Sequence, residues 1–118
     1  MKTYELIGSL GCGSAVVEAA LALANVPHTL TDVPYLKPGA ERDRLLHLNP
    51  LGQVPTLITP DGEVMTESAA MVLHLHDVAP QAGLAPEANK PERAHFLNLV
   101  FFFKQKTAYE LLRSLVGS

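Results

Sequence analysis

The sequence predicts a small α/β sandwich in which one four-stranded mixed sheet carries helices on its faces. Near the N-terminus, a β-prone run, an apolar-striped helix and a second β-prone run follow one another, an order that implies parallel strands joined by a right-handed crossover. Further along, turn residues at 60–62 separate two short β-prone runs, and another striped helix follows. The predicted order is βαβ, helix, then ββα.

Composition limits the function classes. The 118 residues are 47% hydrophobic and 18% charged, which suffices for one modest core but not for two complete domains. The net charge of −3 and the lack of any basic run argue against nucleic acid and anionic membranes as partners. The single cysteine, Cys12, cannot form an internal disulfide, and no apolar run has membrane-spanning length, so we expect a soluble cytoplasmic protein.

The first βαβ unit is predicted from the glycine, serine and proline residues that lie between its elements. Residues 4–7 form a short strand, and a loop with three glycines follows at 8–14. Ser14 suits the N-cap of the next helix, which Pro27 stops. Residues 28–33 alternate in polarity with period two and form the second strand.

The second half supplies a weaker helix at 38–48, strands at 56–59 and 63–66, and a third helix at 68–78. The weak helix is expected to place charged residues on its solvent-exposed face and leucines toward the core. These are Glu41, Arg42, Asp43 and Arg44, against Leu45, Leu46 and Leu48. The third helix has an apolar stripe made of Met71, Leu75 and Val78, with Val72 beside it.

A sharp corner, NPLGQVP at 49–55, separates the weak helix from the third strand. Pro50 ends the helix, Gly52 frees the turn and Pro55 removes a backbone donor next to the strand. If the bond before Pro55 is cis, the N–H and C=O of Val54 face outward and can pair with an extended peptide. The alternative is an ordinary trans proline in a connecting loop.

Taken together, four features resemble the N-terminal, thioredoxin-like domain of cytosolic glutathione transferases. They are the thiol- and hydroxyl-bearing loop before the first helix, the corner at 49–55, the PDG hairpin turn at 60–62, and TESAA at 66–70 opening the third helix. The resemblance covers about residues 3–100, and the corner and the Glu67-Ser68 pair at this separation are specific only in combination. It implies a thioredoxin-like fold and glutathione as a co-substrate, with no other cofactor.

The start of the third helix suits the γ-glutamyl end of glutathione. Ser68 and the first backbone N–H groups offer an anion site aligned with the helix dipole, and Glu67 can pair with the free amine. The alternative is that this pair only caps the helix. By resemblance, Val54 pairs with the cysteinyl part of glutathione, Pro55 is cis and Gln53 contacts the γ-glutamyl or backbone groups.

Lys37 can reach the glycine carboxylate of glutathione, or it can be an ordinary solvated lysine.

The glutathione thiol must be held as a thiolate, and a donor at a helix N-terminus does this. Cys12 is the first candidate because the helix lowers the pKa of a thiol there, and Ser9 is the second. Ser14 suits the cap, and Cys12 can instead be a small buried hydrophobe. The absence of a CxxC motif argues against a dithiol reductase.

We expect no metal site, because His74 and His76 lie two apart on a helix and point in different directions. The predicted organisation is a glutathione-binding domain at 1–79, a linker at 80–89 and the first helix of a truncated all-helical domain at 90–100. The remainder, 101–118, can be back-translated into a sequencing-library adapter, so we expect a non-native tail. The alternative is a genuine divergent helix.

The resemblance therefore implies a fragment of a glutathione transferase, which binds glutathione and activates its thiol for attack on a hydrophobic electrophile. Relatives are usually dimers, so we expect a homodimer in the full-length parent. A non-catalytic binding or interaction module on the same fold is the alternative.

Overall fold

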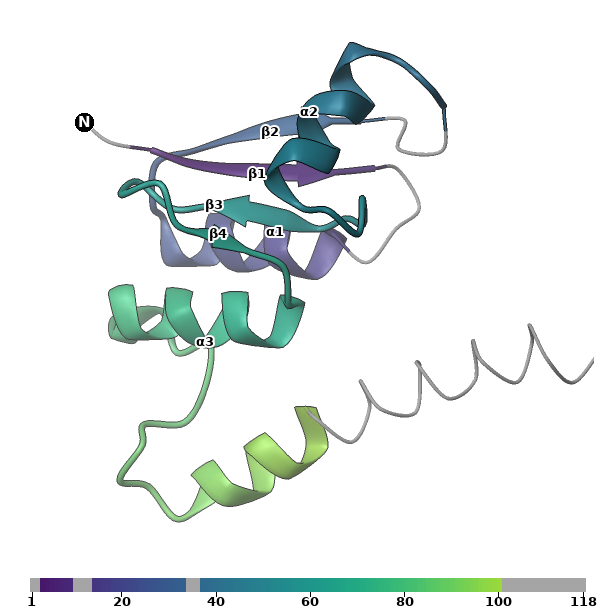
Figure 1. The fold of residues 1–118 in the computed structure, drawn as a ribbon. Helices are drawn as coiled ribbons and strands as arrows, with labels where there is room; N and C mark the ends of the chain where they lie inside the picture. The colour runs from purple at the N-terminus through teal and green to yellow at the C-terminus, as the bar shows by residue number, and fades with distance from the viewer. Residues whose placement is uncertain (1–2, 10–13, 34–36, 101–118) are drawn as a thin grey trace, which may run out of the picture. The chain divides into compact units, whose positions relative to one another are not determined.

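The computed structural model describes residues 3–9, 14–33 and 37–100 (Figure 1). Cys12 and the expected tail at 101–118 lie outside the described residues. The chain divides into two compact units, Met1–Leu84 and Ala85–Ser118, so the boundary falls inside the segment expected to be a linker. The fold and every candidate site residue that the structure describes belong to the first unit.

The first unit is built on one four-stranded sheet with the order β2-β1-β3-β4. The central strand β1 (Tyr4–Gly8) pairs in parallel with β2 (His28–Asp32) and antiparallel with β3 (Thr56–Ile58). The last strand, β4 (Val64–Met65), pairs antiparallel with β3. The predicted mixed sheet, its parallel βαβ unit and its hairpin are confirmed.

Helices cover both faces of this sheet (Figure 1). Against one face lie α1 (Ser14–Ala24) and α3 (Ser68–Val78), and α2 (Ala40–Leu48) lies on the other face. The larger core cluster joins the sheet to α1 and α3, and its most buried members include Leu6, Leu21, Leu57, Met71 and Leu75. A smaller cluster of Ile7, Val33 and Leu45 lies under α2. The sheet is therefore buried on both sides of β1.

Two details differ from the sequence prediction. The weak helix begins at Ala40 rather than residue 38, because Gly39 adopts φ 155° and precedes the first helical residue. In α3, Met71 and Leu75 are fully buried as expected, but Val78 is 49% exposed. Val78 lies in the last turn of the helix, where the chain leaves the sheet, so the apolar stripe ends one turn earlier than predicted.

In the second unit, residues 92–100 are helical, which places the start two residues later than predicted. Arg93 donates from Nη1 to the carbonyl of Pro86 at 2.7 Å, which ties the helix to the segment before it. None of the helices described is both long and apolar enough to cross a membrane.

Candidate functional site

The strand register brings the segment after β1 and the corner before β3 to one end of the sheet. Ile7 pairs with Thr56 in antiparallel register. Because the two chains run in opposite directions, the residues that follow Ile7 and those that precede Thr56 lie beyond the same end of the sheet. Ser9 and Val54 each lie two residues beyond this pair. The sheet therefore places Ser9, the candidate thiol activator that the structure describes, at the same end as the candidate peptide-binding corner.

The start of α3 reaches the same end. Leu57 pairs with Met65, so the chain leaving β4 passes Thr56 and enters α3 at Ser68. In Figure 1 this is the right-hand end of the sheet, where β1 ends and both α1 and α3 begin. The parallel pairing of Gly8 with Asp32 also brings the end of β2 there. The ends of β1, β2 and β4 thus lie with the corner at one end of the sheet.

The corner has the predicted conformation. The Val54-Pro55 peptide bond is cis, as the resemblance implies, and Gly52 has φ 62°. Val54 is half-buried. Neither its N–H nor its C=O bonds to another backbone group among the residues described. The sequence prediction of a pairing edge for an extended peptide requires both groups to lack such bonds.

A buried polar network holds this corner. Asn49 is 3% exposed and Thr56 is 0% exposed. The Asn49 amide donates from Nδ2 to the carbonyl of Gln53 and to Thr56 Oγ1, both at 3.2 Å. The Thr56 hydroxyl donates to the same Gln53 carbonyl at 2.9 Å, and Asn49 Oδ1 accepts from the Leu51 N–H at 3.1 Å. Residues at both ends of the corner therefore bond to its middle.

Sequence reasoning treated Asn49 only as the end of a helix and Thr56 only as the start of a strand. Both are polar residues flanking a Pro- and Gly-rich corner, and that pattern could have marked them. What the sequence does not show is that the corner folds back far enough for the two side chains to meet.

The N-terminus of α3 is open toward the site end. Its N-cap residue is Glu67, with φ −112° and ψ 118°, and no side-chain capping hydrogen bond forms. The first helical bond runs from the Met71 N–H to the Glu67 carbonyl at 3.0 Å, so the N–H groups before Met71 have no partner within the helix. Ser68 is half-buried and Glu67 is exposed. An anion placed here would meet backbone donors and the positive end of the helix dipole.

The loop after β1 is described only in part. Ser9 is half-buried, and its carbonyl accepts from the Ser14 hydroxyl at 3.5 Å. Ser14 is only 7% exposed and is the first residue of α1, so it lies inside the helix rather than at the predicted cap position. A Cβ on Gly8 would lie 2.7 Å from Ser14 Oγ, so this close approach of strand and helix requires glycine.

The remaining predicted ligand residues lie on the surface. Gln53 is exposed at the corner, and Lys37 is exposed ahead of α2. Neither side chain makes a hydrogen bond or ion pair with another described residue that would hold it in place. Both side chains are exposed to solvent.

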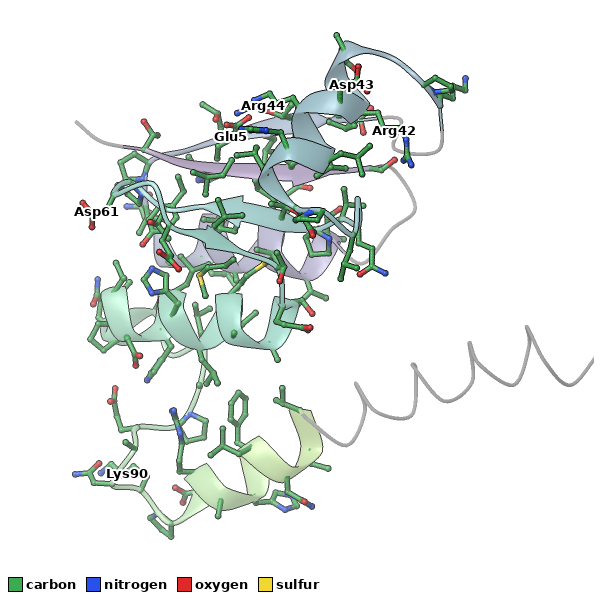
Figure 2. All side chains as sticks on the ribbon, in the orientation of Figure 1. Glu5, Arg42, Asp43, Arg44, Asp61 and Lys90 are labelled. Atoms are coloured by element: carbon green, nitrogen blue, oxygen red, sulfur yellow. The ribbon has the colours of Figure 1, made fainter. Side chains whose placement is uncertain are left out.

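Away from the site, a charged cluster that the sequence did not reveal ties α2 to the sheet. Arg44 makes a two-pronged contact with Glu5, from Nη2 to Oε1 at 2.7 Å and from Nη1 to Oε2 at 2.9 Å (Figure 2). Thr31 also donates to Glu5 Oε2 at 2.7 Å. The hydrogen bonds from Arg44, and secondarily that from Thr31, lower the pKa of Glu5 against the opposing effect of burial.

A second unpredicted contact links β1 to α3. The Tyr4 hydroxyl and His74 Nε2 lie 2.8 Å apart. Burial raises the pKa of Tyr4, and the negative charge of Asp61 adds to the effect. No group of three His, Cys, Asp or Glu side chains within the described ranges could hold a metal ion. The contact with the Tyr4 hydroxyl gives His74 a structural role that the sequence could not show.

Comparisons with known proteins agree with this geometry. The family described as glutathione S-transferase, N-terminal domain, matches residues 14–78. The uncharacterised GST-like protein YncG of Escherichia coli is 41% identical over 97 residues, covering 81% of this chain and 46% of that protein.

Solved structures show the same likeness. A glutathione transferase from Methylococcus capsulatus is 30% identical with a TM-score of 0.77, covering 86% of this chain and 50% of that one. A sphingomonad glutathione S-transferase complexed with glutathione is 32% identical with a TM-score of 0.74, covering 83% and 49%. The chain therefore spans about half the length of the relatives it matches, and it has their N-terminal fold.

Proposed function

This chain belongs to the glutathione S-transferase family, and from that premise we propose that it binds glutathione at the site end of its sheet and activates the thiol. In the full-length parent, the activated thiol attacks a hydrophobic electrophile. The observation that carries the proposal is the convergence of the two unpaired backbone groups of Val54 with the open N-terminus of α3. The cysteinyl backbone of the tripeptide matches the first feature, and its charged γ-glutamyl end matches the second.

The ligand contacts follow from these groups. The N–H and C=O of Val54 pair with the cysteinyl residue of glutathione as an added strand would, next to the cis bond of Pro55. The γ-glutamyl carboxylate lies at the N-terminus of α3 near Ser68, and its amine pairs with Glu67. Gln53 contacts the γ-glutamyl or backbone groups, and Lys37 reaches the glycine carboxylate.

Thiol activation falls to the loop after β1. Cys12 is the first candidate and Ser9 the second, since either group can donate a hydrogen bond to the thiolate near the start of α1. The burial of Ser14 and its bond to the Ser9 carbonyl argue against Ser14 in this role. We further propose a homodimer and a cytoplasmic location for the parent, with residues 1–79 as the glutathione-binding domain.

Binding is tested by calorimetric titration of the 118-residue chain with glutathione, comparing wild type with Glu67→Ala. Loss of the ionic hydrogen bond to the amine should weaken affinity by roughly tenfold or more. Glu63→Ala is the matched control, because Glu63 is an exposed carboxylate in the hairpin at the other end of β3. Unchanged affinity in Glu67→Ala would contradict the site, and a wild-type chain that does not bind glutathione would contradict the function.

Activation is tested by following the ultraviolet absorbance of the glutathione thiolate, as a function of pH, in Cys12→Ala and Ser9→Ala. The variant that lacks the activating group should need a higher pH to form the thiolate. If the wild type binds glutathione without promoting its ionisation, the non-catalytic binding module is the better description.

A further inference from the structure

We propose that Asn49 and Thr56 are positioning residues that aim the Val54 N–H at the ligand and strengthen it as a donor. The inference rests on the proposed function and adds two residues that do not themselves touch glutathione. It is carried by the hydrogen bonds that converge on a single peptide group at the centre of the corner.

That peptide group joins Gln53 to Val54. Its carbonyl oxygen accepts from Asn49 Nδ2 at 3.2 Å and from Thr56 Oγ1 at 2.9 Å. The bond is trans, since the cis bond of the corner is the next one along. In a planar trans peptide the C=O and N–H point in opposite directions. Two buried donors that hold the Gln53 carbonyl inward therefore turn the Val54 N–H away from the protein.

The side chains of Asn49 and Thr56 use all of their donor hydrogens in this network. One Nδ2 hydrogen of Asn49 goes to the Gln53 carbonyl and the other to Thr56 Oγ1, while Oδ1 accepts from the Leu51 N–H. Thr56 passes its own hydroxyl hydrogen to the Gln53 carbonyl. A satisfied network of this kind is rigid, and donors on a carbonyl polarise its peptide so that the N–H becomes a better donor.

The network also closes the corner from both sides. Asn49 follows the last residue of α2, and Thr56 is the first residue of β3. The Gly52 N–H donates to the Asn49 carbonyl at 2.8 Å, so the turn in between is tied to the same residue. An aspartate at position 49 would lack the two donor hydrogens, and an alanine would lack both donor and acceptor.

The test uses Thr56→Val, which removes the hydroxyl with little change of shape, and Thr56→Ser, which keeps it. Glutathione is titrated into each 118-residue variant while the backbone amides of Val54 and Ser68 are followed by NMR. Thr59→Val is the matched control, because Thr59 is also buried and its hydroxyl accepts from the Glu63 N–H at 3.1 Å, at the other end of β3.

We expect Thr56→Val to weaken glutathione binding by about two- to tenfold, the worth of roughly one hydrogen bond. The shift of the Val54 amide on binding should shrink while that of Ser68 is retained. Thr56→Ser should restore both, and Thr59→Val should leave both unchanged. If Thr56→Val does not fold, Thr56→Cys gives the same test, because a thiol is a weak donor.

Two results can overturn the claims, and they differ. If wild type binds and Thr56→Val matches it in affinity and in the Val54 shift, Thr56 is not a positioning residue and the joint proposal for the pair fails, although the proposed function stands. If wild type shows no shift at either amide, the proposed function itself is wrong.

Discussion

At the scale of single residues, the absence of a side chain at Gly8 is a structural requirement of the site end. A Cβ there would lie 2.7 Å from Ser14 Oγ and 2.8 Å from Ser14 Cβ, closer than packed atoms tolerate. The strand can approach the start of α1 because nothing projects between them. The loop that carries Ser9 and Cys12 begins from this contact.

Gly8→Ala should therefore lower the free energy of unfolding by about 1–3 kcal/mol, as other overpacked sites do. Urea unfolding measures the change. The same substitution in a Ser14→Gly background should cost less, because both clashing atoms are then gone. An equal cost in the two backgrounds would show that the contact with Ser14 is not the cause.

Residues next to one another in the sequence were the predictable part of the site. Gln53, Val54, Pro55, Glu67 and Ser68 lie in short motifs, and the residue types alone indicate turn, pairing edge and helix start. The cis bond at Pro55 is confirmed. The roles of these residues toward glutathione remain proposals.

At the scale of elements, the strands and helices could be predicted from the turn and capping residues between them and from the spacing of their apolar residues. The bounds of α3 agree with the prediction because Ser68 gives it a polar start and Pro80, two residues after Val78, prevents it from continuing. The contact between Glu5 and Arg44 was not predictable, since it joins residues 39 positions apart and depends on α2 crossing the sheet. The amphipathic pattern of α2 is weak, and it did not indicate that Arg44 would contact the sheet.

The ion pair predicts how α2 docking depends on pH. The pKa of Glu5 is lowered from its ordinary value of 4.5, mainly by the hydrogen bonds from Arg44, so the ion pair stabilises the fold fully above that value. The stabilisation is lost as the pH falls through the lowered, folded-state pKa. Because Arg44 is 51% exposed, we expect Arg44→Gln to cost no more than about 1 kcal/mol at neutral pH.

Chemical denaturation across acidic and neutral pH measures this dependence. The difference between wild type and Arg44→Gln should narrow as the solution is acidified. Glu63→Gln serves as a control for the loss of an exposed carboxylate elsewhere. A difference between wild type and Arg44→Gln that does not vary with pH would contradict the assignment.

At the scale of the whole molecule, exposed apolar side chains gather on α1. Val16 is 63% exposed and Leu23 is 68% exposed, and their seven-residue spacing puts them on one face of the helix. Met71 and Leu75, on the apolar stripe of α3, add nothing to this surface, because both are fully buried in the core of the first unit.

We therefore expect the 118-residue chain to self-associate through α1 at high concentration. Sedimentation should show a mean mass that rises with protein concentration. The double variant Val16→Lys, Leu23→Lys should remain monomeric over a wider range, whereas Val78→Lys, which changes an apolar side chain on α3 instead, should behave like wild type. A wild-type chain that is monomeric at every concentration would contradict this expectation.

The hairpin at the far end of β3 offers a use for protein engineering. Its turn is closed by the chain itself, with the Thr59 N–H bonded to the Glu63 carbonyl at 2.9 Å and the Gly62 N–H to the Thr59 carbonyl at 2.9 Å. Asp61 and Gly62 at its tip are exposed. Because Val54 and the start of α3 lie at the opposite end of the sheet, a fluorescent or affinity peptide spliced between these two residues would report on the domain without obstructing the ligand there.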